Sequence, residues 1–340
     1  MPCGAIPMNP KETKMKSRRM YASLAALAVA GGSLTLAACG SSDSADTTGG
    51  SGASDLSGKI TIDGSSTVAP LSTAAAERFN ENNPDVNITV GTSGTGGGFE
   101  VFCKGETDIS DASRGIKDEE AETCKKAGVE YEEIRVASDG ITLVTKAGVD
   151  VGKACLNFPE LKKIWSPGSK VNNWSQVGSG FKDLPMALSG PDSQSGTYDF
   201  FNEEVLGEDK NGDVIQPRQD YTASADDNVI VRSVQDAEAG LGYFGFTYFE
   251  ENTDTLQAFA LDGGEGCVEP TTESITSGDY KLSRPLFIYV SKKSLARPEV
   301  QAFVKDYVAN ATELAEANAY VPAPQSALDE SAQKVEAAAS

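Results

Sequence analysis

Three times in this 340-residue chain, a short extended run is followed by a loop rich in serine, threonine and glycine, and then by helical periodicity. The loops are residues 64–67, 92–98 and 193–197. Extended runs that alternate with helices predict a mostly parallel sheet with helices on both faces. We therefore expect an α/β fold in which each sheet is mixed and mostly parallel.

The first 57 residues have a different character from the rest. Five basic residues between Lys11 and Arg19 precede an uncharged stretch that ends in Leu36-Ala37-Ala38-Cys39, which is the pattern of a signal peptide with a lipobox. Glycines and hydroxyl residues interrupt the stretch, and this argues against a membrane span. We expect residues 1–38 to be a signal peptide, Cys39 to be lipidated, and residues 39–57 to be a flexible tether. The mature protein would lie on the outer face of the cytoplasmic membrane, held there by its lipid anchor alone.

Size and charge limit the body of the protein. About 280 residues follow the tether, which suits two domains better than one. The net charge of the chain is −21, and removal of residues 1–38, which hold five basic residues and one acidic residue, leaves −25. Such a charge repels nucleic acid, so we expect no nucleic-acid partner.

Four cysteines remain once Cys3 and Cys39 are set aside. In an exported protein an even number of cysteines suggests disulfides, and four allow three connectivities. Position along the chain favours Cys103 with Cys124 and Cys155 with Cys267. Loop closure would then stabilise the fold by roughly 3 kcal/mol for the short loop and about 4.7 kcal/mol for the long one.

Extended and helical runs suggest where the chain divides. Two extended segments, 134–136 and 141–144, are separated by Ser138-Asp139-Gly140, where the chain could cross into a second domain. In the middle of the chain we expect a helix over 198–206 and an aromatic strand over 241–249. A β-rich run at 286–290 and an amphipathic helix at 300–308 predict a return to the first domain. The expected parts are lobe I, residues 58–138 and 286–340, and lobe II, residues 139–285.

The three loops could together hold an anion. A helix N-terminus presents unpaired N–H groups and partial positive charge, glycine allows close approach, and serine or threonine adds a hydroxyl donor. Ordinary helix capping explains any one loop equally well. Three such loops, with Arg114 after a predicted third strand, favour a shared oxyanion site.

Other chemistries fit poorly. The chain has no histidine, which excludes histidine-based triads and histidine metal sites. The glycine loop lacks the ending of a nucleotide P-loop, and its spacing does not fit a dinucleotide motif. Residues 209–213 break the spacing of a calcium loop. We expect no cofactor and no metal.

Four motifs in order resemble the PstS family, the phosphate-binding lipoproteins of phosphate ABC importers. They begin at Gly64, Ser93, Asp108 and Ser195, and the likeness runs from about residue 58 to 310. The resemblance implies a two-lobed periplasmic-binding-protein fold of type II that closes on phosphate between its lobes and catalyses no reaction. It also implies permease subunits as partners and a monomeric protein. The phosphate ligands that it implies are Ser66, Thr67, Ser93, Ser113, Arg114, Ser195, Gly196 and Thr197.

The sequence departs from the family at two points. Many members have an arginine shortly before Ser-Gly-Thr, where this chain has Pro191 and Asp192, and many have an acidic residue near Ser113. We expect Arg114 to supply the positive charge, and Asp139, or else Asp111, to accept the proton of the ligand. Two alternatives stay open. The same fold could bind sulfate, molybdate or tungstate, or the chain could be a secreted phosphatase with a hydroxyl nucleophile in its first loop.

Overall fold

The structure is a computed structural model that describes residues 56–338. All of these residues belong to one compact unit. The predicted signal peptide, the predicted lipidation site at Cys39 and all but the last two residues of the tether lie outside the described residues.

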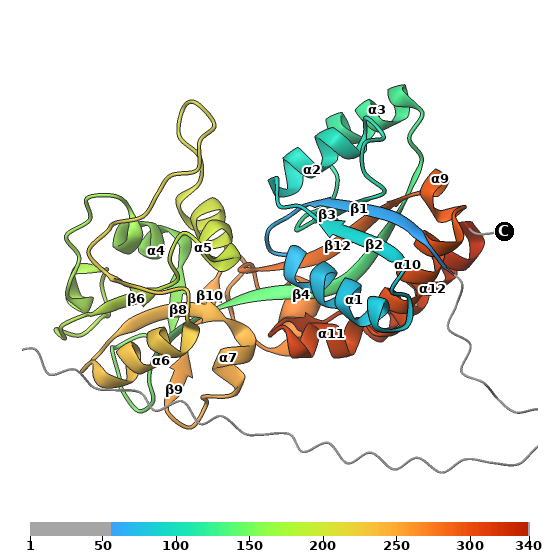
Figure 1. Ribbon diagram of the computed structural model, residues 1–340. Coiled ribbons are helices and arrows are strands. Elements are labelled where there is room, and N and C mark those ends of the chain that lie inside the picture. The colour runs from blue at the N-terminus through green and yellow to red at the C-terminus, as the bar shows by residue number, and fades with distance from the viewer. Residues whose placement is uncertain (1–55, 339–340) are drawn as a thin grey trace, which may run out of the picture. The chain divides into compact units, whose positions relative to one another are not determined.

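Two long strands connect the lobes: β4 (Tyr131–Lys146) and β12 (Ser283–Ser291). They pair with each other in antiparallel fashion near the middle of a ten-stranded sheet whose main order is β2-β1-β3-β12-β4-β8-β6-β7. Figure 1 shows β4 running from the lobe of β1 to the lobe of β8. Strands β1, β2 and β3 are parallel, whereas β12 and β4 are antiparallel to their neighbours, so the sheet is mixed.

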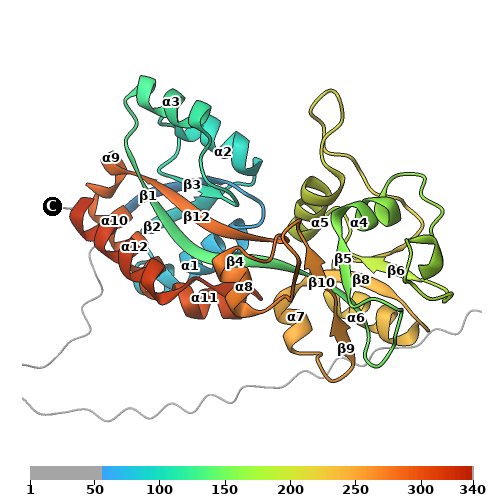
Figure 2. The same cartoon turned by 180° about the vertical axis from the view of Figure 1, so that it is seen from behind.

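Lobe I contains the first segment of the chain and its C-terminal helices. Helices α2 and α3 cover one face of the sheet, and α1 and α10 cover the other (Figures 1 and 2). The elements are β1 (Gly58–Gly64), α1 (Ala69–Asn82), β2 (Val86–Val90), α2 (Gly94–Phe102), β3 (Ile109–Ala112), α3 (Asp118–Ala127), α9 (Lys292–Leu295), α10 (Pro298–Ala309), α11 (Ala311–Ala317), β13 (Val321–Pro322) and α12 (Gln325–Ala338).

Lobe II contains the middle of the chain. A three-stranded sheet, β11-β10-β5, shares an apolar core with the part of the main sheet that lies in lobe II. The elements are β5 (Cys155–Asn157), α4 (Phe158–Trp165), η1 (Trp174–Gln176), β6 (Leu188–Gly190), α5 (Gly196–Phe201), η2 (Asn202–Leu206), β7 (Thr222–Ala223), α6 (Asp227–Asp236), β8 (Leu241–Gly245), α7 (Phe246–Glu250), β9 (Leu256–Ala258), β10 (Ala260–Asp262), β11 (Cys267–Val268) and α8 (Thr272–Ser277).

Each lobe has its own apolar core. In lobe I the alternating residues Ile60 and Ile62 of β1 pack with α1 and α10. The apolar stripe predicted for residues 300–308 is confirmed, since Val300, Phe303, Val304, Tyr307 and Val308 are all buried on α10. In lobe II the core gathers around the aromatic rings of α4, α5 and β8. The lobe limits drawn from the sequence stay a prediction.

The expected interruption at Ser138-Asp139-Gly140 is wrong, because β4 runs unbroken through these residues. Each of the three pairs with a residue of β12, and Gly140 lies so close to α8 that a Cβ there would meet Ile275 Cδ1 at 2.7 Å. Pairing across the sheet therefore overrides the local turn preference of serine, aspartate and glycine. On β4 the partners change at Gly140, from β12 to β8.

The middle of the chain is also more helical than expected in one place. The aromatic run predicted as one strand over 241–249 forms β8 only as far as Gly245, and α7 begins at Phe246. Phe246 is buried in the core of lobe II, so packing decides the change. The helix expected over 198–206 is present, with a π-helical turn over Asn202–Leu206.

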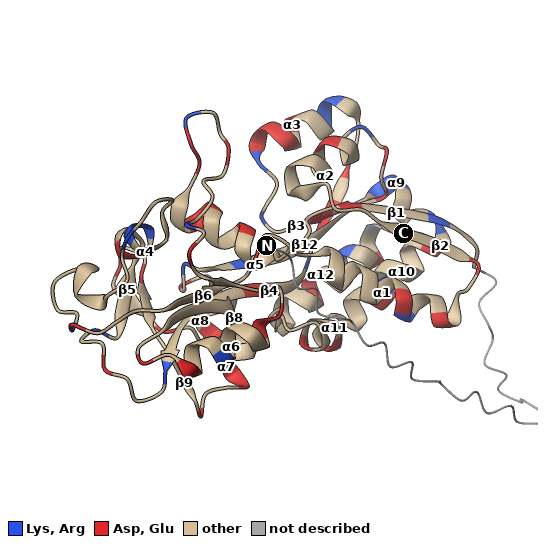
Figure 3. Cartoon of the chain, turned by 60° about the vertical axis from the view of Figure 1, so that its left-hand side comes forward, with Lys and Arg blue, Asp and Glu red and all other residues tan. Residues whose placement is uncertain are grey.

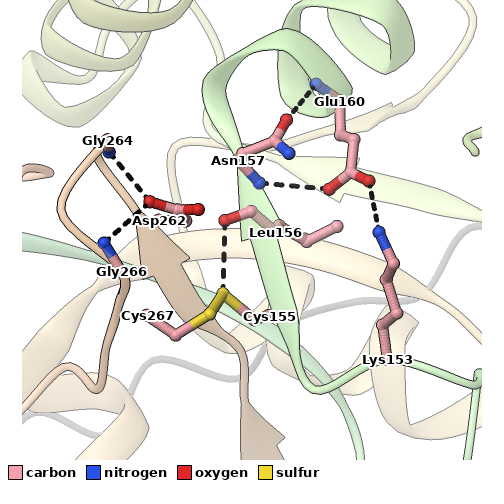
Figure 4. The surroundings of a disulfide bond; sticks show 9 residues. All are labelled: Lys153, Cys155, Leu156, Asn157, Glu160, Asp262, Gly264, Gly266 and Cys267. Atoms are coloured by element: carbon pink, nitrogen blue, oxygen red, sulfur yellow. Dashed lines mark hydrogen bonds and ion pairs between the residues drawn. A yellow bond between two sulfur atoms is a disulfide. The ribbon is translucent and has the colours of Figure 1, made fainter.

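Both predicted disulfides are confirmed. Cys103 and Cys124 join the end of α2 to α3 in lobe I, 21 residues apart. Cys155 and Cys267 join β5 to β11 in lobe II, 112 residues apart. Figure 4 shows the second bond at the edge of the small sheet, where the Asp262 carboxylate accepts hydrogen bonds from the backbone N–H groups of the following turn.

Candidate functional site

The first loop is held at the carboxyl end of β1. The Ser65 N–H donates to the Asp111 carbonyl at 2.9 Å, and the Thr67 N–H donates to Ser65 Oγ at 3.2 Å. Gly64 has a φ of +143°, and a Cβ there would lie 2.1 Å from the Asp111 carbonyl oxygen. Only glycine fits this close approach between β1 and β3. The loop is therefore fixed where α1 begins.

The second and third loops lie against the first. Asp63 Oδ1 accepts hydrogen bonds from the N–H groups of Gly64 at 2.8 Å and Ser93 at 3.0 Å. At the third loop, the hydroxyls of Thr95 and Ser113 are 3.1 Å apart. The Asp63 carboxylate and the pair of hydroxyls thus connect three loops of lobe I, which lie at the carboxyl ends of neighbouring strands.

The fourth loop comes from lobe II and meets the first loop. Ser195 caps α5, because its Oγ accepts a hydrogen bond from the Thr197 N–H at 3.2 Å. A Cβ on Gly196 would lie 2.6 Å from Thr67 Oγ1. The glycine therefore permits the start of α5 to touch the start of α1.

Arg284 lies where these loops meet. It stands on β12 and is 9% exposed. Its Nη2 donates to Thr67 Oγ1 at 2.8 Å and to the Gly196 carbonyl at 3.3 Å. Its Nε donates to Asp139 Oδ2 at 3.3 Å, and its guanidinium carbon lies 3.9 Å from the ring centroid of Phe200. A buried cation thus contacts both lobes at once.

A cavity of about 750 Å³ opens beside Arg284. Its lining combines hydroxyl groups, glycine backbone and charged side chains of both signs. Its polar and charged lining residues are Ser65, Ser66, Thr67, Thr95, Ser113, Arg114, Lys117, Asp199, Glu203, Glu204, Glu208, Gln216, Lys281, Ser283 and Arg284. Acidic residues are otherwise spread over helices and loops of both lobes (Figure 3).

Arg114 also lines the cavity, but its charge is already paired. Its two Nη atoms each lie 2.8 Å from a carboxylate oxygen of Glu120. The hydrogen bonds to Glu120 raise the pKa of Arg114, and burial opposes them. The guanidinium also lies 5.7 Å from the ring centroid of Phe99. Arg114 therefore faces the cavity as one half of a bidentate ion pair.

The two expected proton acceptors lie in different places. Asp139 is buried behind Arg284, and burial raises its pKa while the Arg284 charge opposes the rise. Asp111 lies between the sheet and α1, where Oδ1 accepts a hydrogen bond from Ser72 Oγ at 2.8 Å. Burial raises the pKa of Asp111 to about 8. Asp139 is thus next to the cation of the site, and Asp111 belongs to the core beneath the first loop.

The described residues also limit what else the chain could hold. Within residues 56–338, histidine, cysteine, aspartate and glutamate side chains form no group of three that could bind a metal ion. No helix in that part of the chain is both long and apolar enough to cross a bilayer.

Comparisons with known proteins show which family this two-lobed architecture belongs to. A PBP superfamily domain matches residues 44–311. The phosphate-binding protein PstS of Staphylococcus epidermidis is 40% identical over 302 residues, which cover 87% of each chain. The chain belongs to the PstS family. Protein SphX of Synechococcus elongatus is 44% identical over 279 residues, 81% of this chain and 80% of the relative.

A solved structure supports the same assignment for this PstS-family chain. The crystal structure of a possible phosphate-binding protein from Planctomyces limnophilus has a TM-score of 0.79 and 43% identity. The match covers 84% of this chain and all of that one. The predicted fold class, a two-lobed periplasmic-binding-protein fold with a mixed sheet, is confirmed, and one main sheet runs through both lobes.

The ligand set that the PstS resemblance implies is only partly gathered at the cavity. Ser66, Thr67, Ser113 and Arg114 line it, and Gly196 touches Thr67. The remaining three residues stand at helix starts next to the cavity without lining it. These are Ser93, Ser195 and Thr197.

Sequence reasoning missed Arg284. The available signal was its place in Ser283-Arg284-Pro285, directly before the β-rich run that returns the chain to lobe I. A charged residue at the start of an otherwise apolar strand, where that strand enters from the other lobe, is next to any site between the lobes.

Proposed function

We propose that the chain binds inorganic phosphate outside the cell, in the cavity between its lobes, and delivers it to the permease of a phosphate ABC importer. One observation carries the proposal: three loops at helix starts and the buried guanidinium of Arg284 meet at one cavity. The staphylococcal relative that covers most of the chain is a phosphate-binding protein.

The proposed ligands combine hydroxyl, backbone and guanidinium donors. Ser66 and Thr67 would donate from the start of α1, Ser113 from the third loop and Arg284 from β12. Ser93, Ser195, Gly196 and Thr197 would contribute at the starts of α2 and α5 once the lobes close further. Such donors favour an oxyanion without requiring an equal number of formal charges. Arg114, paired with Glu120, would make a weaker contribution.

The acidic part of the cavity favours an anion that carries a proton. Asp199 and Glu204 line the cavity, and burial raises the pKa of each, while Arg284 opposes the rise. Phosphate near neutral pH can donate a proton to a carboxylate, whereas sulfate cannot. A site built around such a hydrogen bond can bind the anion that makes it about 10⁴-fold more tightly than an anion that cannot. Asp139, which accepts a hydrogen bond from Arg284, remains our proposed acceptor, and Asp199, which lines the cavity, is the alternative.

Isothermal titration with phosphate and with sulfate at pH 7 tests the proposal. We expect phosphate to bind with one site per chain and sulfate to bind far more weakly. If Asp139 is the acceptor, Asp139→Asn should reduce the ratio of phosphate affinity to sulfate affinity. If Asp199 is the acceptor, Asp199→Asn should reduce that ratio instead. Equal affinity for phosphate, sulfate and molybdate would refute the phosphate assignment.

We also propose that the protein is a binder and not an enzyme, and that it acts as a monomer. A turnover assay with a generic phosphomonoester tests the first point, because a secreted phosphatase would release product at a rate that depends on the first-loop hydroxyls. Sedimentation tests the second point.

The lipid anchor is a further part of the proposal. Export, cleavage before Cys39 and acylation of that cysteine would hold the body at the membrane. Cys39→Ala should leave an uncleaved precursor, which membrane fractionation and intact mass would detect. A wild-type protein whose mass contains no lipid would contradict this part alone.

A further inference from the structure

A short segment after α11 joins the two lobes without belonging to either long strand. We call residues 318–322 the strap. Val321 and Pro322 pair with Ser138 and Ala137 of β4, next to the point where β4 changes partners. Tyr320 packs against the apolar core of lobe I, and Val321 is buried in the core of lobe II. Neighbouring residues of the strap are thus anchored in different lobes.

The strap enters this position through a strained residue. Ala319 has a φ of +60°, and it is the only residue other than glycine with positive φ among residues 56–338. The Tyr320 N–H donates to the Ala315 carbonyl and the Ala319 N–H to the Glu316 carbonyl, which is the hydrogen-bond pattern of a Schellman motif. Glycine usually occupies this left-handed position, and a side chain there is unfavourable. Contacts around Ala319 therefore hold it in place.

One of these contacts comes from lobe II. Thr247 Oγ1, on α7, donates to the Ala319 carbonyl at 2.7 Å. The next residue of the strap contacts lobe I, since the Tyr320 hydroxyl donates to the Thr67 carbonyl at 2.7 Å. A continuous path thus runs from α7 of lobe II to the first loop of lobe I, through two hydrogen bonds, the Ala319–Tyr320 peptide unit and the Tyr320 side chain.

The Tyr320 hydroxyl stays protonated and can act as a hydrogen-bond donor. Burial raises the pKa of Tyr320, and the Asp139 carboxylate adds to the rise while Arg284 opposes it. The phenol therefore keeps its proton over the physiological range and donates it to the Thr67 carbonyl. Thr67 is the residue whose Oγ1 accepts a hydrogen bond from Arg284 on its other side.

We propose that Tyr320 is a positioning residue for the anion site, whose hydroxyl fixes the Thr67 loop at a place set by lobe II through Thr247 and Ala319. The inference rests on the proposed function, because it concerns the affinity of that same site. Loss of the bond frees the loop in the bound state, and most affinity changes of this kind are changes of the dissociation rate.

The experiment follows radiolabelled inorganic phosphate as it dissociates from the wild-type chain during a chase with unlabelled phosphate. Tyr320→Phe removes only the hydroxyl, and we expect dissociation to become about threefold to tenfold faster, the usual effect of one hydrogen bond. Thr247→Val removes the bond to the strap from the other lobe and should also speed dissociation. The double variant should be no faster than Tyr320→Phe alone, because both changes interrupt one path.

Tyr280→Phe is the matched control. Tyr280 is fully buried in lobe II, and its hydroxyl has no hydrogen-bond partner within the described residues. We expect phosphate to dissociate from this variant at the wild-type rate. Loss of one hydrogen bond should lower the melting temperature of ligand-free Tyr320→Phe by a few degrees at most, so the variant stays folded while its dissociation rate is measured.

Three results would contradict the inference. Wild-type dissociation from Tyr320→Phe would refute the role of the hydroxyl. Rate increases that multiply in the double variant would show that Thr247 and Tyr320 act independently. A lower melting temperature with unchanged dissociation would make the bond merely structural. A wild-type chain that retains no phosphate would instead refute the proposed function, and the role of the strap with it.

Discussion

The two lobes present opposite chemistry to the same cavity. Lobe I contributes hydroxyl groups, glycine backbone and the cations Arg114 and Lys117, and no carboxylate lines the cavity from its loops among the described residues. Lobe II contributes the apolar ring of Phe200, four carboxylates and one lysine, which are Asp199, Glu203, Glu204, Glu208 and Lys281. Arg284 lies between them, hydrogen-bonded to Thr67 on one side and to Gly196 on the other.

This difference suggests how the work of binding is divided. Lobe I has most of the groups at the cavity that attract an oxyanion, whereas lobe II adds Lys281 and the start of α5, so lobe I is the surface on which an anion would first be held. The carboxylates of lobe II repel an anion unless it carries a proton or is neutralised by Arg284. Selectivity would then come from lobe II and attraction from lobe I. The predictions below test this division, beginning with the largest expected effect.

The disulfides allow the stability of the two lobes to be compared. Replacing Cys155 and Cys267 with serine opens a loop of 112 residues in lobe II and should lower the free energy of unfolding by about 4.7 kcal/mol. The same change at Cys103 and Cys124, which close 21 residues in lobe I, should cost about 3 kcal/mol. Urea unfolding of the two double variants measures the difference. Equal losses would show that chain entropy does not set the stability of these lobes.

The two arginines sharpen the comparison at the site. Arg284→Ala leaves Asp139 buried without its partner and removes the bridge between lobes, so phosphate affinity should fall by a factor of about 10² or more. Arg114→Ala should reduce the affinity about tenfold or less, because Glu120 already pairs with Arg114. Isothermal titration compares the two variants directly. A larger loss for Arg114→Ala would restore Arg114 as the main counter-charge.

The importance of Arg284 shows where sequence reasoning reached its limit. Three of the four loops, most of the strands and helices along the chain and the favoured disulfide pairs could be predicted, because helix starts, alternating apolar residues and cysteine positions are visible in the sequence. The position of Arg284 depends on β12 pairing with β4 beside Asp139, which lies 145 residues earlier in the chain. Pairing over that separation cannot be read from local pattern, so the place of Arg284 before the β-rich run shows only that it lies near the border between the lobes and not what it contacts.

The acid beneath the first loop should make the stability of lobe I depend on pH. Burial raises the pKa of Asp111 from 3.8 to about 8, so the folded chain holds a proton that the unfolded chain releases. The sign follows: this group stabilises the fold fully below about pH 4, and its contribution is lost as the pH rises towards 8. Between pH 5 and 7 the loss should approach about 1.4 kcal/mol per pH unit.

Asp111→Asn tests this contribution, because the amide oxygen can still accept the hydrogen bond from Ser72 and the side chain cannot ionise. Relative to the wild type, the variant should gain unfolding free energy as the pH rises from 5 to 7. Asp220→Asn is a control in lobe II, since its pKa is lowered to about 2 by the hydrogen bond from Arg218 and it does not titrate in this range. A constant difference between wild type and Asp111→Asn would mean that Asp111 is ionised in the folded chain.

The smallest expected effect compares the threonines at the two helix starts. Thr67→Ala removes the hydroxyl that accepts from Arg284 and touches Gly196, so phosphate affinity should fall about tenfold. Thr197→Ala should cost only about threefold, because the Thr197 N–H, which bonds to Ser195 Oγ, and the other backbone donors at the start of α5 remain. Thr67→Ser and Thr197→Ser keep the hydroxyls and should bind nearly as the wild type does. Isothermal titration of the four variants with phosphate tests this prediction. If lobe I provides most of the attraction, Thr67→Ala must lose more phosphate affinity than Thr197→Ala. If Thr197→Ala lost more affinity than Thr67→Ala, attraction would belong to lobe II, and the division of work between the lobes would have to be reversed.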